Sequence, residues 1–423
     1  MTDVATEACS LDQFRAECVA FLDANAAPKA ADDQPFVWGE GDDEVALFAE
    51  VDRATEQAAL ARAKAWRAAR DDSGLAWITG PVALGGRGLS SAHERAYAVL
   101  ESRYRIPDTS FFAIGLGMVA PTIAAHATPA VQARYLPALY RGEVVACQLF
   151  SEPGAGSDLA SLQMRAERDG DEWVLNGQKV WTSGAQYSDI GEVICRTDPD
   201  LPKHRGLTGF VVDMTAAGVE VRPLRQMTGG AAFNEVFFTD VRVPDDHRLG
   251  DVNQGWTVAL TTLMNERASI GGASGGMGLA TMSRLTEMLR HFGLDDDPVR
   301  RQQLAGLYIH FQVARLTNQR ALAKLAAGQL PGPELSTAKL SLTQNLYRMA
   351  EFVADVLGPR ITADTGEWGT FSWSTFLCGV PGMRIAGGSD EVMRNIVAER
   401  VLGLPKEPGI DTKSPFRDLP TSV

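Results

Sequence analysis

Glu266 and Arg267 place charge on what is otherwise the apolar face of a predicted helix. At about 100° per residue, an apolar stripe runs from Trp256 to Ile270, with Arg267 near its middle and Glu266 at its edge. Charges on a buried stripe are costly unless they are paired or used. An internal salt bridge is one explanation. A general base is the other, because desolvation of a half-buried carboxylate moves its pKa toward neutrality.

A second candidate site is a loop of small residues between two acidic ones, residues 151–158, Ser-Glu-Pro-Gly-Ala-Gly-Ser-Asp. Its backbone amides and the hydroxyls of Ser151 and Ser157 can hydrogen-bond a flat heteroaromatic ring or a carbonyl group. Downstream, residues 181–183, Trp-Thr-Ser, put a large aromatic face beside two hydroxyls, which can stack on a ring and hydrogen-bond its edge. An ordinary turn and a core tryptophan are the alternatives.

Three other patterns point to different enzyme classes and have little support. Residues 115–120 fit a dinucleotide fingerprint, but Pro121 would lie in the helix that must follow, and no βα alternation surrounds it. Residues 272–276 fit the G-x-S-x-G pattern around Ser274, yet a helix pattern precedes it and a hydrolase elbow needs a strand. The six histidines include no pair at metal-ligand spacing, so no metal is expected.

Composition excludes several classes of protein. The net charge of −13 has the wrong sign for a protein whose main partner is nucleic acid or an anionic membrane. Five scattered cysteines without a C-x-x-C pair fit reduced thiols in a cytosol. The N-terminus lacks a signal peptide, and no apolar run reaches the ~20 residues that span a bilayer, so a cytoplasmic protein without a membrane span is expected.

A length of 423 residues corresponds to about three domains. Helical spacing, with a capping-box pattern at Ser10, predicts an N-terminal helical domain at 1–143, including a long helix over 43–70. Period-two spacing predicts a β domain at 144–245, and helical spacing returns over 246–423, where Asp297 is expected to cap a helix. This order argues for an α+β fold, mainly α, and against a βαβ chain.

Within the β domain, the strongest local signal is a predicted tight hairpin. Asn176-Gly177 lies between two strand-like runs, Trp173 to Leu175 and Gln178 to Trp181. Asn-Gly supplies the positive φ that a type I′ turn requires. The residues at 181–183 would then end the second strand of the hairpin.

Taken in order, four segments resemble the acyl-CoA dehydrogenase family: residues 151–158, 171–183, 237–244 and 385–394. The resemblance covers nearly the whole chain and is weakest before residue 75. It implies an N-terminal helical domain, a middle β-barrel-like domain and a C-terminal four-helix bundle. It also implies non-covalent FAD and an acyl-CoA substrate. A carboxylate would remove the α-proton while the β-hydrogen leaves as hydride to flavin N5, giving a trans-2-enoyl-CoA as in fatty acid β-oxidation.

The resemblance also assigns site residues by position. The expected flavin contacts are Gln148, Phe150, Ser151, Gly156, Ser157, Trp181, Thr182 and Ser183. Ser389 and Glu391 of the last helix would complete the adenine end, with an arginine of a neighbouring subunit that Arg290 resembles loosely. The expected substrate contacts are Ser157, Arg267 and Gly388. The implied partners are an electron-transfer flavoprotein and further copies of the chain in a dimer or tetramer, with a hetero-oligomer left open.

The base position departs from the commonest family pattern. Many members carry the catalytic glutamate directly before the Gly-Thr of the last motif, a position that Gly387 holds here. In the isovaleryl-CoA type the glutamate lies in the earlier helix directly before an arginine, which Glu266 and Arg267 match. The resemblance therefore implies Glu266 as the base. An acyl-CoA oxidase or flavin monooxygenase of the same fold, and a non-catalytic subunit of a hetero-oligomer, remain alternatives.

Overall fold

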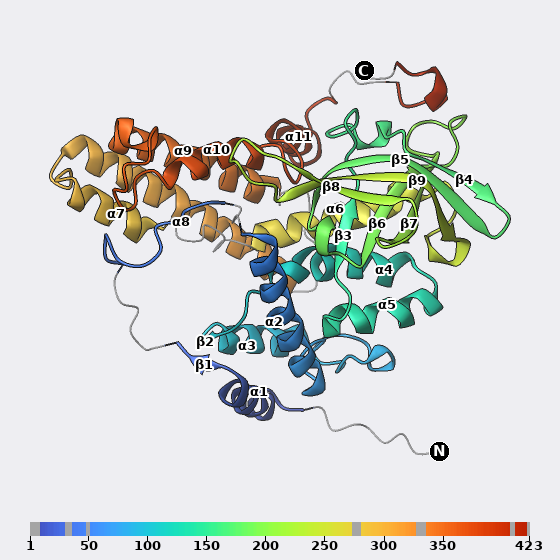
Figure 1. Ribbon diagram of the computed structural model, residues 1–423, viewed down its shortest axis with the longest axis horizontal. Coiled ribbons are helices and arrows are strands. Elements are labelled where there is room, and N and C mark those ends of the chain that lie inside the picture. The colour runs from blue at the N-terminus through green and yellow to red at the C-terminus, as the bar shows by residue number, and fades with distance from the viewer. Residues whose placement is uncertain are drawn as a thin grey trace.

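The computed structural model describes residues 9–29, 36–47, 51–272, 281–326, 336–406 and 411–420, without the side chains of 267–272, 321–322 and 324–326. Helices of the N-terminal part lie below a central sheet, and a second set of helices extends from the sheet to one side (Figure 1). The fold is thus α+β and mainly helical, as predicted. None of the described helices is both long and apolar enough to cross a lipid bilayer.

The N-terminal part is helical. Ser10 caps the first helix as predicted, because its Oγ accepts the backbone N–H of Gln13 at 3.2 Å. The second helix was expected to begin at residue 43 but begins at Arg53, where the Asp52 carboxylate caps it. Residues 115–119 form a π-helical turn that continues into α4, so they make no nucleotide-binding loop. The helices are α1 Leu11–Asn25, α2 Arg53–Asp72, α3 Ser91–Glu101, α4 Ala120–His126 and α5 Pro129–Arg141; the short strands β1 Ala27–Pro28 and β2 Tyr104–Arg105 pair with each other.

The middle part is one sheet with the strand order β10-β7-β6-β4-β5-β9-β8, and β3 also pairs with β6. Most neighbours are antiparallel, while β3 runs parallel to β6. The strands are β3 Ala146–Leu149, β4 Arg165–Asp169, β5 Glu172–Ser183, β6 Ile190–Arg196, β7 Leu207–Asp213, β8 Val219–Leu224, β9 Phe233–Pro244 and β10 Arg248–Leu249.

The hairpin predicted at Asn176-Gly177 is wrong. The chain turns instead between β4 and β5, at Gly170 with φ +67°, and β5 runs straight through Gly177. Gly177 lies at a shift in the register of β5 against β9, with φ +148°. A Cβ there would lie 2.8 Å from Met164 Cγ, so the glycine serves a β-bulge and a close approach to Met164.

Strand β6 divides its side chains between two cores. Val193 and Cys195 enter a core within the sheet, whereas Ile190 and Ile194 enter a core shared with α4, α5 and α6. Side chains alternate along a strand, so Glu192 belongs to the face that the helices cover. A carboxyl group therefore lies between the sheet and the helices.

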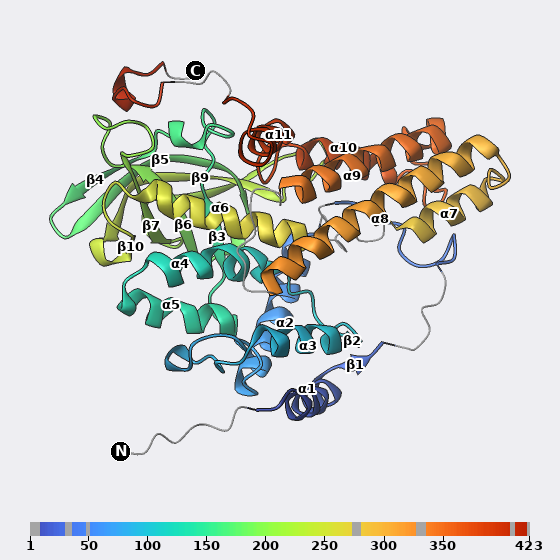
Figure 2. The same cartoon turned by 180° about the vertical axis from the view of Figure 1, so that it is seen from behind.

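Helices resume after β10. Asp297 caps α8 as predicted, because its Oδ1 accepts the backbone N–H of Val299 at 2.8 Å. Helices α7 to α10 surround one apolar core, which gives the expected four-helix bundle. Helix α6 packs against the sheet, α4 and the bundle, and Figure 2 shows it running from the sheet toward the bundle. The helices are α6 Gly255–Gly272, α7 Met282–His291, α8 Pro298–Ala326, α9 Ser336–Leu357, α10 Trp373–Met383 and α11 Asp390–Ile396.

Candidate active site

A buried lysine fixes the start of the small-residue loop. Lys179 Nζ on β5 donates to Glu152 Oε1 at 2.9 Å, to the carbonyl of Phe150 at 3.0 Å and to the carbonyl of Ile194 at 2.8 Å. The Glu152 carboxylate also accepts the backbone N–H of Met164 at 3.0 Å. These bonds use all three ammonium protons, so the buried charge is compensated and the loop is tied to the sheet.

Sequence reasoning did not identify Lys179 or Glu152 as functional. Lys179 is fully buried, and Glu152 is 8% exposed. One signal was available: Lys179 lies inside a strand beside Val180, which is buried. Because lysine is almost never fully buried unless it is paired, a lysine in such a strand indicates a buried partner. Its partner could not be named from sequence, since the two residues are far apart along the chain.

The rest of the loop is only partly open to solvent. Gly156 and Ser157 are exposed, Ser151 is half-buried, and Phe150 is buried. The Ser151 carbonyl accepts the backbone N–H of Val180 at 2.9 Å, which aligns the loop with β5. A hollow of about 400 Å³ borders the loop; its lining residues are Glu152, Pro153, Gly154, Gln163, Met164, Gly177 and Gln178. None of the predicted flavin contacts lines this hollow; of those in the loop, Gly156 and Ser157 are accessible because they are exposed.

Trp181 projects outward from an irregularity in β5. Its φ of +61° lies in the left-handed region, and the register against β9 shifts between Lys179 and Thr182. Its side chain is 57% exposed and meets the edge of Phe233 at a centroid distance of 6.0 Å. A bulge of this kind re-aims a side chain, and a non-glycine residue with positive φ is characteristic of ligand sites. The structure thus excludes a core tryptophan here.

Thr182, the next residue, is buried, whereas Trp181 is exposed. It is 1% exposed, and its Oγ1 is buried with no hydrogen-bond partner in the described part of the chain. Its carbonyl accepts a hydrogen bond from Asn234 Nδ2 at 3.1 Å, and Ser183 pairs with Phe233 across to β9. An exposed aromatic ring beside an unsatisfied hydroxyl fits a flat ligand with a hydrogen-bonding edge, such as a flavin.

Helix α6 brings the turn of Glu266 to strand β6, beside the start of the predicted flavin loop. Glu266 is half-buried, as expected, and the side chain of Arg267 lies outside the described residues, as does the whole of Ser274. One turn before Glu266, Thr262 Oγ1 is hydrogen-bonded to Glu192 Oε1 at 2.5 Å. Glu192 in turn lies opposite Gln148 in the pairing of β6 with β3. The helix of the predicted base is therefore bonded to the strand beside the first residue of the predicted flavin loop.

Helix α11 supplies the second group of predicted contacts. Ser389 caps it, with Oγ accepting the backbone N–H of Val392 at 3.2 Å, and Glu391 is exposed beside Arg394 Nη1 at 3.3 Å. Gly388 has φ +86°, and a Cβ there would lie 2.5 Å from Met393 Cε. Gly387 has φ +66°. The alternative base position of the family is thus a left-handed turn that disfavours a side chain.

Arg290 does not join these residues within one chain. It lies on α7, where its exposed side chain pairs with Glu287. Helix α7 lies at the end of the bundle far from the sheet, whereas α11 lies at the near end, as both views show (Figures 1 and 2). A contact between Arg290 and a ligand at Trp181 would therefore need a second copy of the chain.

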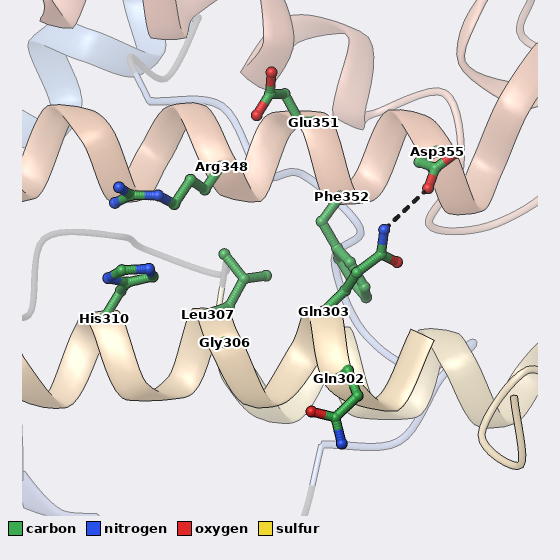
Figure 3. A pocket seen from close by; sticks show the side chains of 9 residues that line it. All are labelled: Gln302, Gln303, Gly306, Leu307, His310, Arg348, Glu351, Phe352 and Asp355. Carbon is green, nitrogen blue, oxygen red and sulfur yellow. Dashed lines mark hydrogen bonds between the residues drawn. The ribbon is translucent and has the colours of Figure 1, made fainter. Parts of the chain in front are cut away.

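A separate hollow of about 390 Å³ lies between α8 and α9, away from the sheet (Figure 3). Gln303 Nε2 donates to Asp355 Oδ2 at 3.4 Å across its rim. Its other lining residues are Gln302, Gly306, Leu307, His310, Arg348, Glu351 and Phe352. None of the predicted site residues lines it.

Sequence comparison matches three successive segments to one family. Residues 41–143 match the acyl-CoA dehydrogenase N-terminal domain, 147–241 the middle domain and 253–402 the C-terminal domain. The chain belongs to the acyl-CoA dehydrogenase family. It is therefore an oxidoreductase acting on CH–CH groups, and membership implies a flavin cofactor.

Curated acyl-CoA dehydrogenases align over most of the chain. IpdE1 of Mycobacterium tuberculosis is 38% identical over 355 residues, which are 83% of this chain and 90% of that protein. FadE34 of the same organism is 41% identical over 292 residues, which are 68% of this chain but 39% of that protein. The chain thus spans nearly the whole of one relative and well under half of the other.

Solved acyl-CoA dehydrogenases share the architecture. The structure described as "Tcur3481-Tcur3483 steroid ACAD" superposes with a TM-score of 0.72 at 26% identity, covering 94% of this chain and 98% of that one. A glutaryl-coenzyme A dehydrogenase complex gives 0.67 at 22% identity, with 98% and 99% coverage, and supports the fold alone.

Proposed function

We propose that the protein is an FAD-dependent acyl-CoA dehydrogenase that converts an acyl-CoA thioester to the trans-2-enoyl-CoA, with Glu266 as the base. One observation carries this proposal. The α6 turn that bears Glu266 is hydrogen-bonded, through Thr262, to the strand beside the predicted flavin loop. The alternative base position is occupied by the left-handed turn at Gly387.

The chain offers separate groups for the two ends of the cofactor. Trp181 would stack on the isoalloxazine, the Thr182 hydroxyl would bond its edge, and the loop from Gln148 to Ser157 would border it. Ser389 and Glu391 would meet the adenine end, completed by Arg290 of a second copy. When bound, the flavin accepts the hydride that leaves the β-carbon.

Glu266 would perform the proton-transfer half of the reaction. Its carboxylate accepts the α-proton, the α-carbon electron pair forms the new double bond, and the β-hydrogen departs with its electron pair. The Glu266 side chain is half-buried on a helix that packs against α4 and the sheet, which limits the access of bulk water to the base. Ser157, exposed at the loop tip, and Gly388 would border the thioester, and Arg267 would hold charge balance beside the base.

The substrate class and the electron acceptor are the finer parts of the proposal. Steroid acyl-CoA dehydrogenases are among the structural relatives, so bulky acyl groups belong beside straight-chain fatty acyl groups in any test. Electron-transfer flavoprotein is the proposed acceptor, and the rival oxidase activity predicts fast reaction of the reduced flavin with oxygen. Assembly as a homodimer or homotetramer is proposed. Pairing with a second chain is the alternative, since some relatives are described as complexes of two chains.

The deciding experiment is an anaerobic titration of the purified flavoprotein with straight-chain, branched and steroid-derived acyl-CoA thioesters. Selective bleaching of the flavin band identifies the substrate class. Glu266→Gln should keep the flavin and the substrate affinity while slowing bleaching by about a thousandfold, because general base catalysis contributes 10²–10⁴-fold. Bleaching at the wild-type rate in this variant would remove Glu266 from the mechanism, and a colourless protein would refute the function itself.

A further inference from the structure

A buried row of polar side chains joins the β domain to the helix of the proposed base. Thr262 Oγ1 lies 2.5 Å from Glu192 Oε1 and 2.9 Å from Thr122 Oγ1, so groups from β6, α6 and α4 form one hydrogen-bonded row. All three side chains are fully buried. Thr122 Oγ1 also donates to the carbonyl of Met118 at 2.9 Å. Apolar side chains of similar volume would pack at least as favourably as these polar ones. Packing alone therefore does not explain the polar row.

The row lies between the two halves of the proposed site. Glu192 is paired with Gln148 on one side and with Val211 on the other. Thr262 and Glu266 are one helical turn apart, so their side chains share a face of α6. Glu192 is therefore one strand from the flavin loop and one turn from the base.

The surroundings of Glu192 favour its neutral form. Burial raises the pKa of Glu192 to about 8, the hydrogen bond from Thr262 opposes this shift, and the negative charge of Glu266 adds to it. Glu192 Oε2 is buried and makes no hydrogen bond within the described part of the chain. A carboxylate would leave that charged oxygen without a donor. A carboxylic acid with its proton on Oε1 donates it to Thr262 Oγ1 and leaves only a carbonyl oxygen at Oε2; Thr262 then donates to Thr122, and Thr122 to the carbonyl of Met118.

The other groups around the row do not supply a compensating charge. Gln148 and Val211, the strand neighbours, are uncharged. On α4, Thr122 is neutral, and His126 bonds to Thr261 Oγ1 at 2.8 Å. Burial lowers the pKa of His126 below its ordinary value of 6.5, so the neutral imidazole predominates at pH 7. Among the described residues, Glu266 is the group whose charge acts on Glu192.

We propose that Glu192 is a positioning residue for Glu266: held neutral, its carboxyl fixes through Thr262 the α6 turn that carries the base, and leaves the negative charge of the pair on Glu266. In two interacting carboxyls the more buried one retains the proton, and the other is free to act as a base. This inference rests on the proposed function, in which Glu266 accepts the α-proton. Ionisation of Glu192 would place a second negative charge beside Glu266, and the repulsion would displace Glu266 from its position. The rate of flavin reduction should therefore fall above pH 8.

Two variants separate charge from packing. Glu192→Gln keeps the shape and a hydrogen-bonding group but cannot ionise, and Glu192→Met keeps only the volume. Infrared difference spectra between pH 7 and pH 9.5, recorded without substrate, should show loss of a protonated-carboxyl stretch in the wild type and in Glu266→Gln, and no such loss in Glu192→Gln.

Flavin reduction by Glu192→Gln should match the wild type within about threefold at pH 7 and lack the alkaline fall. Glu192→Met should reduce flavin about ten- to a hundredfold more slowly with unchanged substrate affinity, because small misplacements of a reacting group cost this much.

The outcomes distinguish this inference from the function on which it rests. The inference is overturned if Glu192→Gln still loses a protonated-carboxyl stretch between pH 7 and pH 9.5. It is also overturned if Glu192→Met reduces flavin at the wild-type rate. Should Glu192→Met fail to fold, the infrared signal and the pH profile of Glu192→Gln still decide. Full activity of Glu266→Gln would instead reject the base assignment, whatever Glu192 does, while the infrared result would still report the protonation of Glu192.

Discussion

Lys179 Nζ lies 2.9 Å from Glu152 Oε1, and both side chains are buried, Lys179 on β5 and Glu152 within the loop that is proposed to hold the flavin. The ammonium also bonds the carbonyls of Phe150 and Ile194, so it joins the loop to two places on the sheet. A fully bonded ion pair of this kind is costly to break from one side only, because the remaining charge stays buried.

Replacing Lys179 by methionine should therefore destabilise the protein and release the flavin. Removal of one partner of a buried pair costs about 3–5 kcal/mol. We expect a lower unfolding temperature of the apoprotein and a reduced flavin content per chain, measured by calorimetry and by absorbance. The double variant with Glu152→Gln should recover part of the stability, since no unpaired carboxylate remains.

The matched control is Arg165→Ala on the neighbouring strand β4. Arg165 and Glu167 form an ion pair whose side chains are 63% and 69% exposed. Exposed pairs contribute about 0–1 kcal/mol, so this variant should keep its flavin and nearly its full stability. If Lys179→Met behaved like Arg165→Ala, the buried pair would not hold the loop.

Thr182→Val should separate cofactor binding from stability. The Thr182 hydroxyl is buried without a partner among the residues that the structure describes, so its removal should leave the apoprotein as stable as the wild type or more so. If the hydroxyl bonds the flavin, the variant should bind flavin about five- to 150-fold more weakly, equivalent to 1–3 kcal/mol. Fluorescence titration of the apoprotein with FAD measures the affinity, and calorimetry measures the stability.

Thr208→Val provides the opposite pattern as a control. Thr208 is also fully buried, but its Oγ1 accepts the backbone N–H of Asn253 at 2.9 Å and bonds Thr197 Oγ1 at 2.8 Å. This variant should lose stability because its partners are left unsatisfied. Unchanged FAD affinity in Thr182→Val would show that the hydroxyl does not face the cofactor.

Local signals in the sequence were sufficient for several elements. The caps at Ser10 and Asp297 could be predicted because the capping side chain and the N–H that it accepts lie within three residues. The Asn-Gly signal at 176–177 failed, since the same positive φ at Gly177 serves a bulge against Met164. That contact depends on the position of Met164, in a separate segment of the chain just before β4.

The candidate site was predictable where it follows a family motif and not where it depends on long-range burial. Trp181 and Thr182 could be named, but nothing local indicated that the ring would be exposed, or that the hydroxyl would be buried with no partner in the described ranges. Glu192 was overlooked, although a charged residue among apolar ones in a strand was a visible signal. The role of Glu192 depends on its hydrogen bond with Thr262, which lies on a helix 70 positions later in the sequence.

Glu192 should make stability depend on pH in a defined direction. Its pKa is about 8 in the folded protein and 4.5 as the ordinary value, so the folded state binds more protons between these limits. Stability from this group is therefore lost as pH rises from about 4.5 to 8. Glu192→Gln removes the effect, so its unfolding temperature relative to the wild type should rise between pH 5.5 and pH 8.5. A constant difference across this range would mean that Glu192 has an ordinary pKa.

Arg290 should contact the flavin of a neighbouring subunit, because α7 and the sheet lie at opposite ends of the folded molecule (Figures 1 and 2). Its side chain is 59% exposed, so Arg290→Ala should weaken FAD binding without unfolding the protein. Mixing Arg290→Ala with Thr182→Val subunits after dissociation then provides a direct test. If each site takes Thr182 from one chain and Arg290 from the other, about a quarter of the sites in a randomly mixed dimer regain both groups. FAD titration should show this high-affinity fraction only after mixing, and its absence would place Arg290 outside the cofactor site.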